Sequence, residues 1–171
     1  MTAAGAYSVL PWQAFFAGEV GAAASLTGLL FVAVSINLRA ILSFPRLPAR
    51  AGETLALLLL VAVIASLALV PQDPRALAAE MIVCAGGLAA AVLTVQLRHG
   101  PDDPDDPWWW YLSRIATIQL PALLFLTGGV TLALRQGGGL YWLAPAVLTA
   151  FLGAVYNAWV LLVEIIRQHP G

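Results

Sequence analysis

The residues best suited to chemistry are two acidic side chains inside long apolar runs of the sequence. Glu19 lies seven residues after Trp12, a side chain typical of membrane interfaces, and so about 10 Å into a helix. Glu80 lies at a comparable depth in a later run. Two carboxylates at one level could share a proton or coordinate a cation, which predicts a site in the outer third of a membrane. The alternative is structural pairing with Arg75 and Arg135, which fall on the same side.

The last apolar run carries a second polar pair. Asn157 and Glu164 lie seven residues apart, on one face of a helix. Together with Glu19 and Glu80 they could form a polar path across a bilayer. The alternatives are a hydrogen bond between helices for Asn157, as for Gln119 in the preceding run, and pairing of Glu164 with the arginine three residues on.

Small residues recur along the first apolar run in alternating steps of four and three. This spacing places them on one stripe of a helix, and small residues allow close helix approach in lipid. The stripe either packs inside one subunit or lines the axis or pore of a symmetric oligomer. Similar faces in the third and fifth runs predict that the three helices pack together. The members are Ala14, Gly18, Gly21, Ser25, Gly28, Val32 and Ser35 in the first run, Glu80, Cys84, Gly87, Ala91 and Thr94 in the third, and Ala150, Gly153, Asn157, Val160 and Glu164 in the fifth.

The sequence contains no recognisable catalytic, metal or cofactor motif. His99 and His169 fall outside the apolar runs, so haem ligation within a membrane is not expected, and their spacing resembles no zinc signature. The aspartates of "DDPDD" lack the spacing of a calcium loop. Cys84 is the single cysteine and is interpreted as a packing residue. We therefore expect no metal, no cofactor and no enzymatic activity.

The composition indicates an integral membrane protein. Of 171 residues, 61% are hydrophobic and 10% are charged, with a mean hydropathy of +0.87. Soluble proteins have roughly half apolar and a quarter charged residues. The net charge of −1 disfavours a nucleic-acid partner, which would select clustered basic residues. The use of arginine alone for all eight basic residues, with many alanines and leucines, favours a bacterial origin.

Five apolar runs are long enough to cross a bilayer, which takes about 20 residues as a helix. Continuous helices are expected because lipid offers no partner to unpaired backbone groups. The separators contain helix-ending signals: two prolines in "FPRLPARAGE", Asp73 as an N-cap before Pro74, and the glycines of "RQGGG". Pro121 predicts a kink that frees the carbonyl of Thr117. The prediction is one all-α transmembrane domain over residues 1–171, with spans at about 13–36, 54–70, 77–97, 114–134 and 141–166, the second of them short.

The placement of arginines predicts the orientation, because basic residues near span ends are retained on the cytoplasmic side. Arg75 and Arg135 fall on one side of the predicted bundle, and the other six arginines fall on the opposite side. The N-terminus is therefore expected outside and the C-terminus in the cytoplasm. The six residues on the cytoplasmic side are Arg39, Arg46, Arg50, Arg98, Arg114 and Arg167.

The stretch "RHGPDDPDDPWWWYLSR" predicts an interfacial anchor rather than a metal site. Asp106 is suited to cap a helix, and Pro107 is suited to its first turn. The aromatic residues then fall at headgroup level, where amphipathic rings concentrate, and the aspartates form an acidic cap beside them. The anchor residues are Trp108, Trp109, Trp110 and Tyr111.

The run "GLLFVAVSINLRAIL", followed by "LPARAGETLALLLL", lies within residues 28 to 60. It resembles an uncharacterised family of small multi-span bacterial membrane proteins. The resemblance covers the first two spans and carries over no catalytic or binding residues.

Together these features predict a homo-oligomeric ion or proton channel, or a small transporter, in the bacterial cytoplasmic (inner) membrane. The alternative is a non-catalytic accessory or regulatory protein that binds another membrane protein through its small-residue helix faces. The expected partners are the lipid bilayer, further copies of the chain and, in the alternative, another membrane protein.

Overall fold

The computed structural model describes residues 3–44, 47–99 and 108–167. Within these ranges the chain is helical and contains no strand. The long helices are α2 (Gln13–Ile36), α4 (Leu47–Leu69), α5 (Pro74–His99), α6 (Trp108–Leu134) and α7 (Leu143–Arg167). Short helices flank them: α1 (Ala3–Ala6), η1 (Leu10–Trp12), α3 (Leu38–Leu42) and η2 (Gly139–Trp142).

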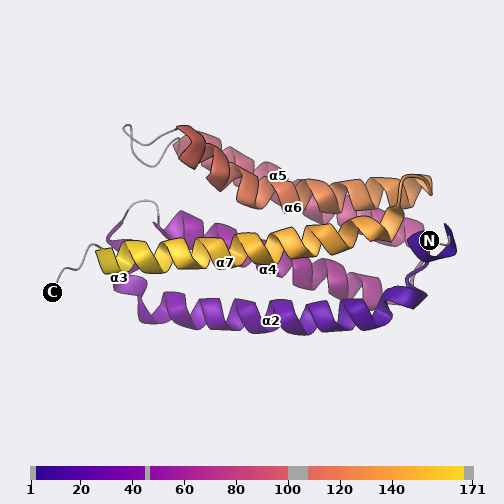
Figure 1. Ribbon diagram of the computed structural model, residues 1–171, viewed down its shortest axis with the longest axis horizontal. Coiled ribbons are helices and arrows are strands. Elements are labelled where there is room, and N and C mark those ends of the chain that lie inside the picture. Colours follow the sequence, from indigo (N-terminus) through magenta and orange to yellow (C-terminus); the bar gives the residue numbers. More distant parts are fainter. Residues whose placement is uncertain (1–2, 45–46, 100–107, 168–171) are drawn as a thin grey trace.

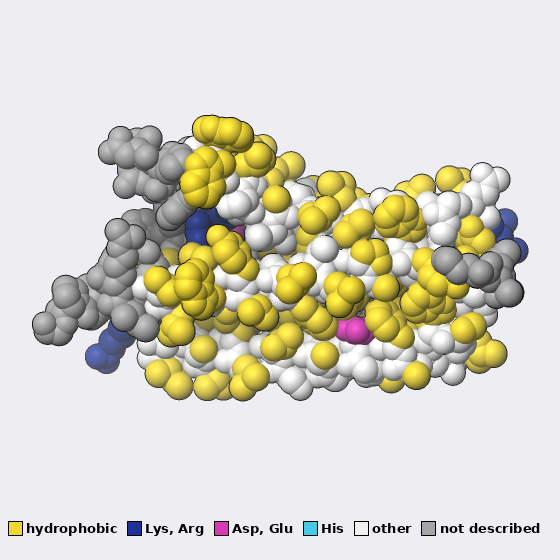
Figure 2. Space-filling model, viewed as in Figure 1, with side chains coloured by type: hydrophobic (Ala, Val, Ile, Leu, Met, Phe, Trp, Pro, Cys, Tyr) yellow, Lys and Arg dark blue, Asp and Glu magenta, His cyan; other side chains and the backbone are white. Residues whose placement is uncertain are grey.

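All five long helices are long and apolar enough to cross a membrane. They run side by side in an elongated bundle, with the N-terminal segment at one end and the end of α7 at the other (Figure 1). Hydrophobic side chains extend over the length of the face in Figure 2, whereas basic side chains lie towards its two ends. The prediction of an all-α, multi-pass membrane protein is confirmed.

The five helices have unequal shares of the interior. The α5–α6 hairpin forms one side of the bundle, α2 forms the other, and α4 and α7 lie between them (Figure 1). In the most apolar part of α4, half of the residues are buried. In the most apolar part of the first span, which contains α2, only 6% are buried. The main core joins all five helices through residues such as Phe16, Leu57, Met81, Phe125 and Val147. Because α2 packs chiefly against α4, most of its surface is left uncovered.

The N-terminal segment packs against the α6–α7 connection, which lies more than 130 residues later in the sequence. The Trp12 indole donates to the carbonyl of Gly5 at 2.7 Å and stacks edge-on against Tyr141, with 5.1 Å between ring centroids. The Tyr7 hydroxyl accepts a hydrogen bond from the backbone of Gly138. Gly139 has φ +53, and a Cβ at this position would collide with the carbonyl of Ala6. A glycine is therefore required for this contact, which we call the N-terminal latch.

The helix boundaries differ from the predicted ones mainly at α4. The structure starts this helix at Leu47, seven residues before the predicted start at 54, so the second span is not short. Pro48 does not end a helix here because it lies in the first turn, where its missing N–H has no intrahelical role. By contrast α2 matches its predicted range of 13–36. The predicted cap at Asp73 is confirmed, since its carboxylate accepts a 2.7 Å bond from the backbone N–H of Arg75.

Pro121 lies inside a continuous α6, which bends along its length (Figure 1). Proline lacks the N–H that would bond the carbonyl four residues back, that of Thr117. The backbone of α7 passes close to this carbonyl, because a Cβ added to Gly153 would lie 2.9 Å from the Thr117 oxygen. α6 ends at Leu134, and the next residue, Arg135, adopts the left-handed conformation (φ 52). The glycines that were predicted to end this helix follow it.

The arginines separate between the two ends of the bundle as predicted. Arg75 and Arg135 lie near the N-terminal latch. Arg39, Arg50, Arg98, Arg114 and Arg167 lie at the opposite end, which we call the arginine-rich end. Arg46 lies outside the described residues.

Candidate functional site

A buried ion pair lies at the arginine-rich end, between the second turn of α4 and the second turn of α6. The Nη2 atom of Arg114 is 2.8 Å from Oε1 of Glu53, and its Nε is 3.5 Å from Oε2. The side chains are only 3% and 5% exposed, respectively. Burial of two charges is tolerated when they face each other in this two-pronged arrangement, so the pair fixes α4 against α6.

Gln96, from the last turns of α5, completes a three-helix cluster. Its Nε2 donates to Oε2 of Glu53 at 3.2 Å, and its own backbone carbonyl accepts a bond from the Tyr111 hydroxyl. The side chain of Gln96 is fully buried, and its Oε1 has no partner among the described residues. Both carboxylate oxygens of Glu53 are therefore occupied by protein donors. The Glu53–Gln96–Arg114 cluster therefore connects α4, α5 and α6, and its carboxylate has no oxygen left without a protein donor.

Sequence reasoning missed this cluster because Glu53 was assigned to a break between spans. Once residues 47–53 are helical, Glu53 becomes an acid inside a membrane-length helix. The sequence offered one signal, because Glu53 lies near the start of one span and Arg114 lies near the start of another. Nothing in the sequence shows that these starts are neighbours, since 61 residues separate the two side chains.

Glu80 has a local partner of its own. Its Oε2 accepts a 2.8 Å bond from Nε2 of Gln72, which also donates to the carbonyl of Leu67 at the end of α4. This bond connects α5 to the α4–α5 turn. The observed partner of Glu80 is therefore Gln72, whereas the sequence had suggested Arg75 or Arg135. α4 packs against both α2 and α5, and the described residues show no contact between the carboxylates of Glu19 and Glu80. No hydrogen bond joins the two carboxyl groups among the described residues, and a joint acidic site stays a prediction.

Glu19 lies on the side of α2 that packs on α4, where it is partly buried. That face carries the buried side chains Phe16 and Ala23, one turn to either side of Glu19. One carboxylate oxygen, Oε2, is inaccessible to solvent and has no hydrogen-bond partner among the described residues. A carboxyl oxygen in this state needs a donor, a proton or a cation. Among the acidic side chains that the structure describes, Glu19 is therefore the one without a protein partner.

The small-residue stripe of α2 points away from the bundle. Each of its seven members is exposed. A Cβ added to Gly18, Gly21 or Gly28 would meet nothing within 4 Å. Packing of this stripe inside one subunit is therefore not observed, and Ser25 and Ser35 likewise face outward. Its role in packing between chains or in lining a pore stays a prediction.

The other two small-residue faces divide between inside and outside. On α7, Ala150, Gly153 and Asn157 are buried. On α5, by contrast, Gly87 and Ala91 are exposed, as is Thr94. The expectation that the three faces pack together is wrong for the single chain, because only α7 turns its small face inward. Its purpose is close approach to α6, where Gly153 meets the carbonyl of Thr117.

The predicted polar path is present only in part. Asn157 is 3% exposed and lies on the packed face of α7. The side chain of Glu164 lies outside the described part of the structure. Gln119 donates to the carbonyl of Ala89 on α5 at 3.2 Å, which confirms its predicted bond between helices.

The predicted interfacial anchor starts α6. Trp108 and Trp109 are 74% and 55% exposed, while Tyr111 turns towards Gln96. Rings at the start of a spanning helix suit a headgroup layer. The side chain of Trp110 and the residues from 100 to 107, with the predicted cap Asp106, lie outside the described residues.

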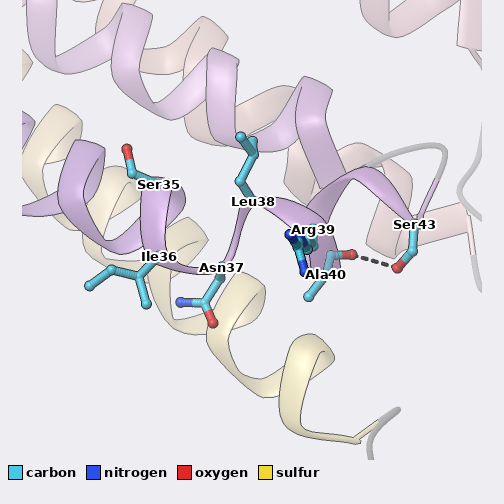
Figure 3. A pocket seen from close by; sticks show the side chains of 7 residues that line it. All are labelled: Ser35, Ile36, Asn37, Leu38, Arg39, Ala40 and Ser43. Carbon is cyan, nitrogen blue, oxygen red and sulfur yellow. Dashed lines mark hydrogen bonds between the residues drawn. The ribbon is translucent and has the colours of Figure 1, made fainter.

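A cavity of about 750 Å³ marks the junction of α2 and α3. Its polar side chains do not converge: Ser35 and Asn37 point to opposite sides of the backbone (Figure 3). Ser35, Asn37 and Ser43 each bond to a carbonyl of their own helical segment. Arg39 is the charged residue among those that line it. The junction therefore offers no assembled binding site.

No group of three or more potential metal ligands occurs among the described residues. His169 and the aspartates of the α5–α6 connection lie outside them. Comparisons with protein-family models, curated proteins and solved structures found no match for this chain.

Proposed function

We propose that this multi-pass membrane protein assembles with copies of itself through the exposed face of α2 and conducts protons or cations along that interface. Glu19 is the group that binds the ion. Two observations carry the proposal: the unpartnered carboxyl oxygen of Glu19, on the side of α2 that faces α4, and the small-residue stripe on the other side of the same helix, which is exposed.

The packing of the chain favours a path between subunits. An apolar core joins the five helices, and of the five candidate spans the one that contains α2 has the smallest buried share. Exposed glycines on a membrane helix allow a second helix to approach closely. In a closed ring of chains, symmetry would place every Glu19 at one level, beside the interface between α2 and α4 of its own chain.

The test is ion flux into liposomes that contain the purified protein, with a pH-sensitive dye inside. We expect flux above that of empty liposomes and its loss in Glu19→Gln. The matched control is Glu80→Gln, because Glu80 is held by Gln72 and lies on another helix. No flux above empty liposomes would refute conduction, and unchanged flux in Glu19→Gln would refute the assigned site.

Assembly through α2 has an independent test. In a Cys84→Ser background, Gly21→Cys or Ser25→Cys should form disulfide-linked dimers in the membrane. Val83→Cys is the matched control, since this residue is 71% exposed but lies on α5. Equal cross-linking at Val83 and at the α2 positions would contradict a specific α2 interface.

A second candidate function is that of an accessory subunit that docks the α2 stripe on another membrane protein. The observation in its favour is the apolar core that joins the five helices, together with the pairing of the buried charges of Glu53 and Arg114 with each other. This role predicts no flux and no α2–α2 disulfide, but a stoichiometric complex that Gly21→Leu breaks.

We place the protein in the bacterial cytoplasmic membrane with the arginine-rich end inside. In the Cys84→Ser background, an impermeant maleimide should then label Gln136→Cys in intact cells and Ser43→Cys only after lysis. The reverse pattern would refute the orientation.

A further inference from the structure

A second cavity, of about 350 Å³, lies as a groove between α6 and α7. Ala116, Leu120 and Pro121 line it from α6, and Leu152 and Gly153 line it from α7. The groove exists because α7 crosses α6 at a glycine and α6 presents an alanine and a proline, so little side-chain volume fills the seam. Leu120 and Leu152 form walls that are 49% and 71% exposed, which opens the groove to surrounding lipid.

The hydroxyl groups of the groove are mostly engaged. Thr117 donates to the carbonyl of Arg114 at 2.7 Å, and Thr149 donates to that of Pro145 at 2.7 Å. No acidic or basic side chain lines the groove, so its surface carries no charge. Tyr156 also lines the groove, is 48% exposed, and has no hydrogen bond from its hydroxyl among the described residues.

The depth of Tyr156 makes this phenol unusual. It lies 13 residues after Leu143 and 11 before Arg167, roughly 20 Å and 16 Å from the ends of α7 at about 1.5 Å per residue. That is near the middle of a hydrocarbon core about 30 Å thick. Water and lipid ester groups are confined to the interfaces, so a lipid-facing hydroxyl at this depth lacks an acceptor.

We propose that the groove binds a neutral, lipid-soluble molecule whose carbonyl group accepts a hydrogen bond from Tyr156. The apolar body of the ligand lies against Leu120, Pro121 and Leu152. Isoprenoid quinones have this chemistry, because they carry a ring carbonyl on an uncharged molecule that resides within the bilayer. The absence of a charged side chain from the groove lining disfavours an anionic lipid. The proposal depends on α6 and α7 and is independent of the α2 interface.

The test is isothermal titration calorimetry, in which the protein in nanodiscs is titrated with decylubiquinone, a short-chain quinone. We expect saturable binding with one site per chain. Tyr156→Phe should weaken binding about 2- to 10-fold through loss of one hydrogen bond. Ala116→Leu should abolish it by filling the groove, and Ala116 is exposed, so this change leaves the packed core intact.

Two controls separate this site from general partition into lipid. Leu148→Phe adds a ring to the exposed surface of α7 outside the groove lining and should bind as the wild type does. Decylbenzene has the same tail but no carbonyl and should bind weakly. Non-saturable uptake, equal affinity for decylbenzene, or wild-type affinity in either Tyr156→Phe or Ala116→Leu would overturn the proposal.

Discussion

Replacement of Arg114 by methionine removes the charge opposite Glu53 while it keeps most of the apolar stem. Glu53 is 5% exposed, so its carboxylate would remain buried without a counter-charge. Opposite charges about 4 Å apart attract by about 4 kcal/mol at an effective dielectric constant of about 20. The loss of one partner of a buried pair costs about 3–5 kcal/mol, and we expect Arg114→Met to lower the free energy of unfolding by this amount.

The measurement is unfolding in mixed micelles by titration with SDS, followed by tryptophan fluorescence. The double variant Glu53→Met/Arg114→Met should recover most of the loss, because no charge is left in the site. Gln96 then lacks its acceptor, which leaves a deficit of about 1–3 kcal/mol that a further Gln96→Leu change should remove. The control Arg98→Met, at the same end but exposed, should stay within about 0.5 kcal/mol of the wild type.

Two results would refute this reasoning. If Arg114→Met lowered the free energy of unfolding by less than about 1 kcal/mol, the ion pair would be hydrated and screened by solvent, as surface ion pairs are. A double variant as unstable as the single one would mean that the stem of Arg114, rather than its charge, stabilises the site.

Two glycine substitutions test close contacts by the same assay. Gly153→Ala should destabilise by about 1–3 kcal/mol, because its Cβ would lie 2.9 Å from the backbone oxygen of Thr117; the control Gly87→Ala, with nothing within 4 Å, should be neutral or slightly stabilising. An equal effect at both positions would contradict the close crossing of α6 and α7. Gly139→Ala should open the N-terminal latch, since φ is +53 and the Cβ would collide with Ala6; faster proteolysis of the N-terminal segment is the expected readout, and unchanged protection would contradict the latch.

The five spans could be predicted because a long apolar run has few alternatives to a membrane helix. Both ends of α2 and the cap at Asp73 were also predictable, since these signals are local. The start of α4 was not. Its "LPARAGE" stretch contains proline, glycine and charge, which favour a break in a lipid context. The buried charge is compensated by Arg114 on another helix, and periodicity carries no information about that partner.

The candidate site residues show the same division between local and long-range information. Spacing alone identified the small faces of α2 and α7 as stripes on helices. Their environments are opposite, since Gly153 is buried and Gly21 is exposed. A small residue suits close approach equally well whether the partner is the same chain or another one. Only the order of helices in space distinguishes the two cases.

The N-terminal latch also has a consequence for biosynthesis. Tyr7 leaves the ribosome 131 residues before its partner Gly138, so α2 enters the membrane long before the α6–α7 connection exists. The N-terminal latch can therefore form only after the α6–α7 connection has been made, so this contact depends on the later helices.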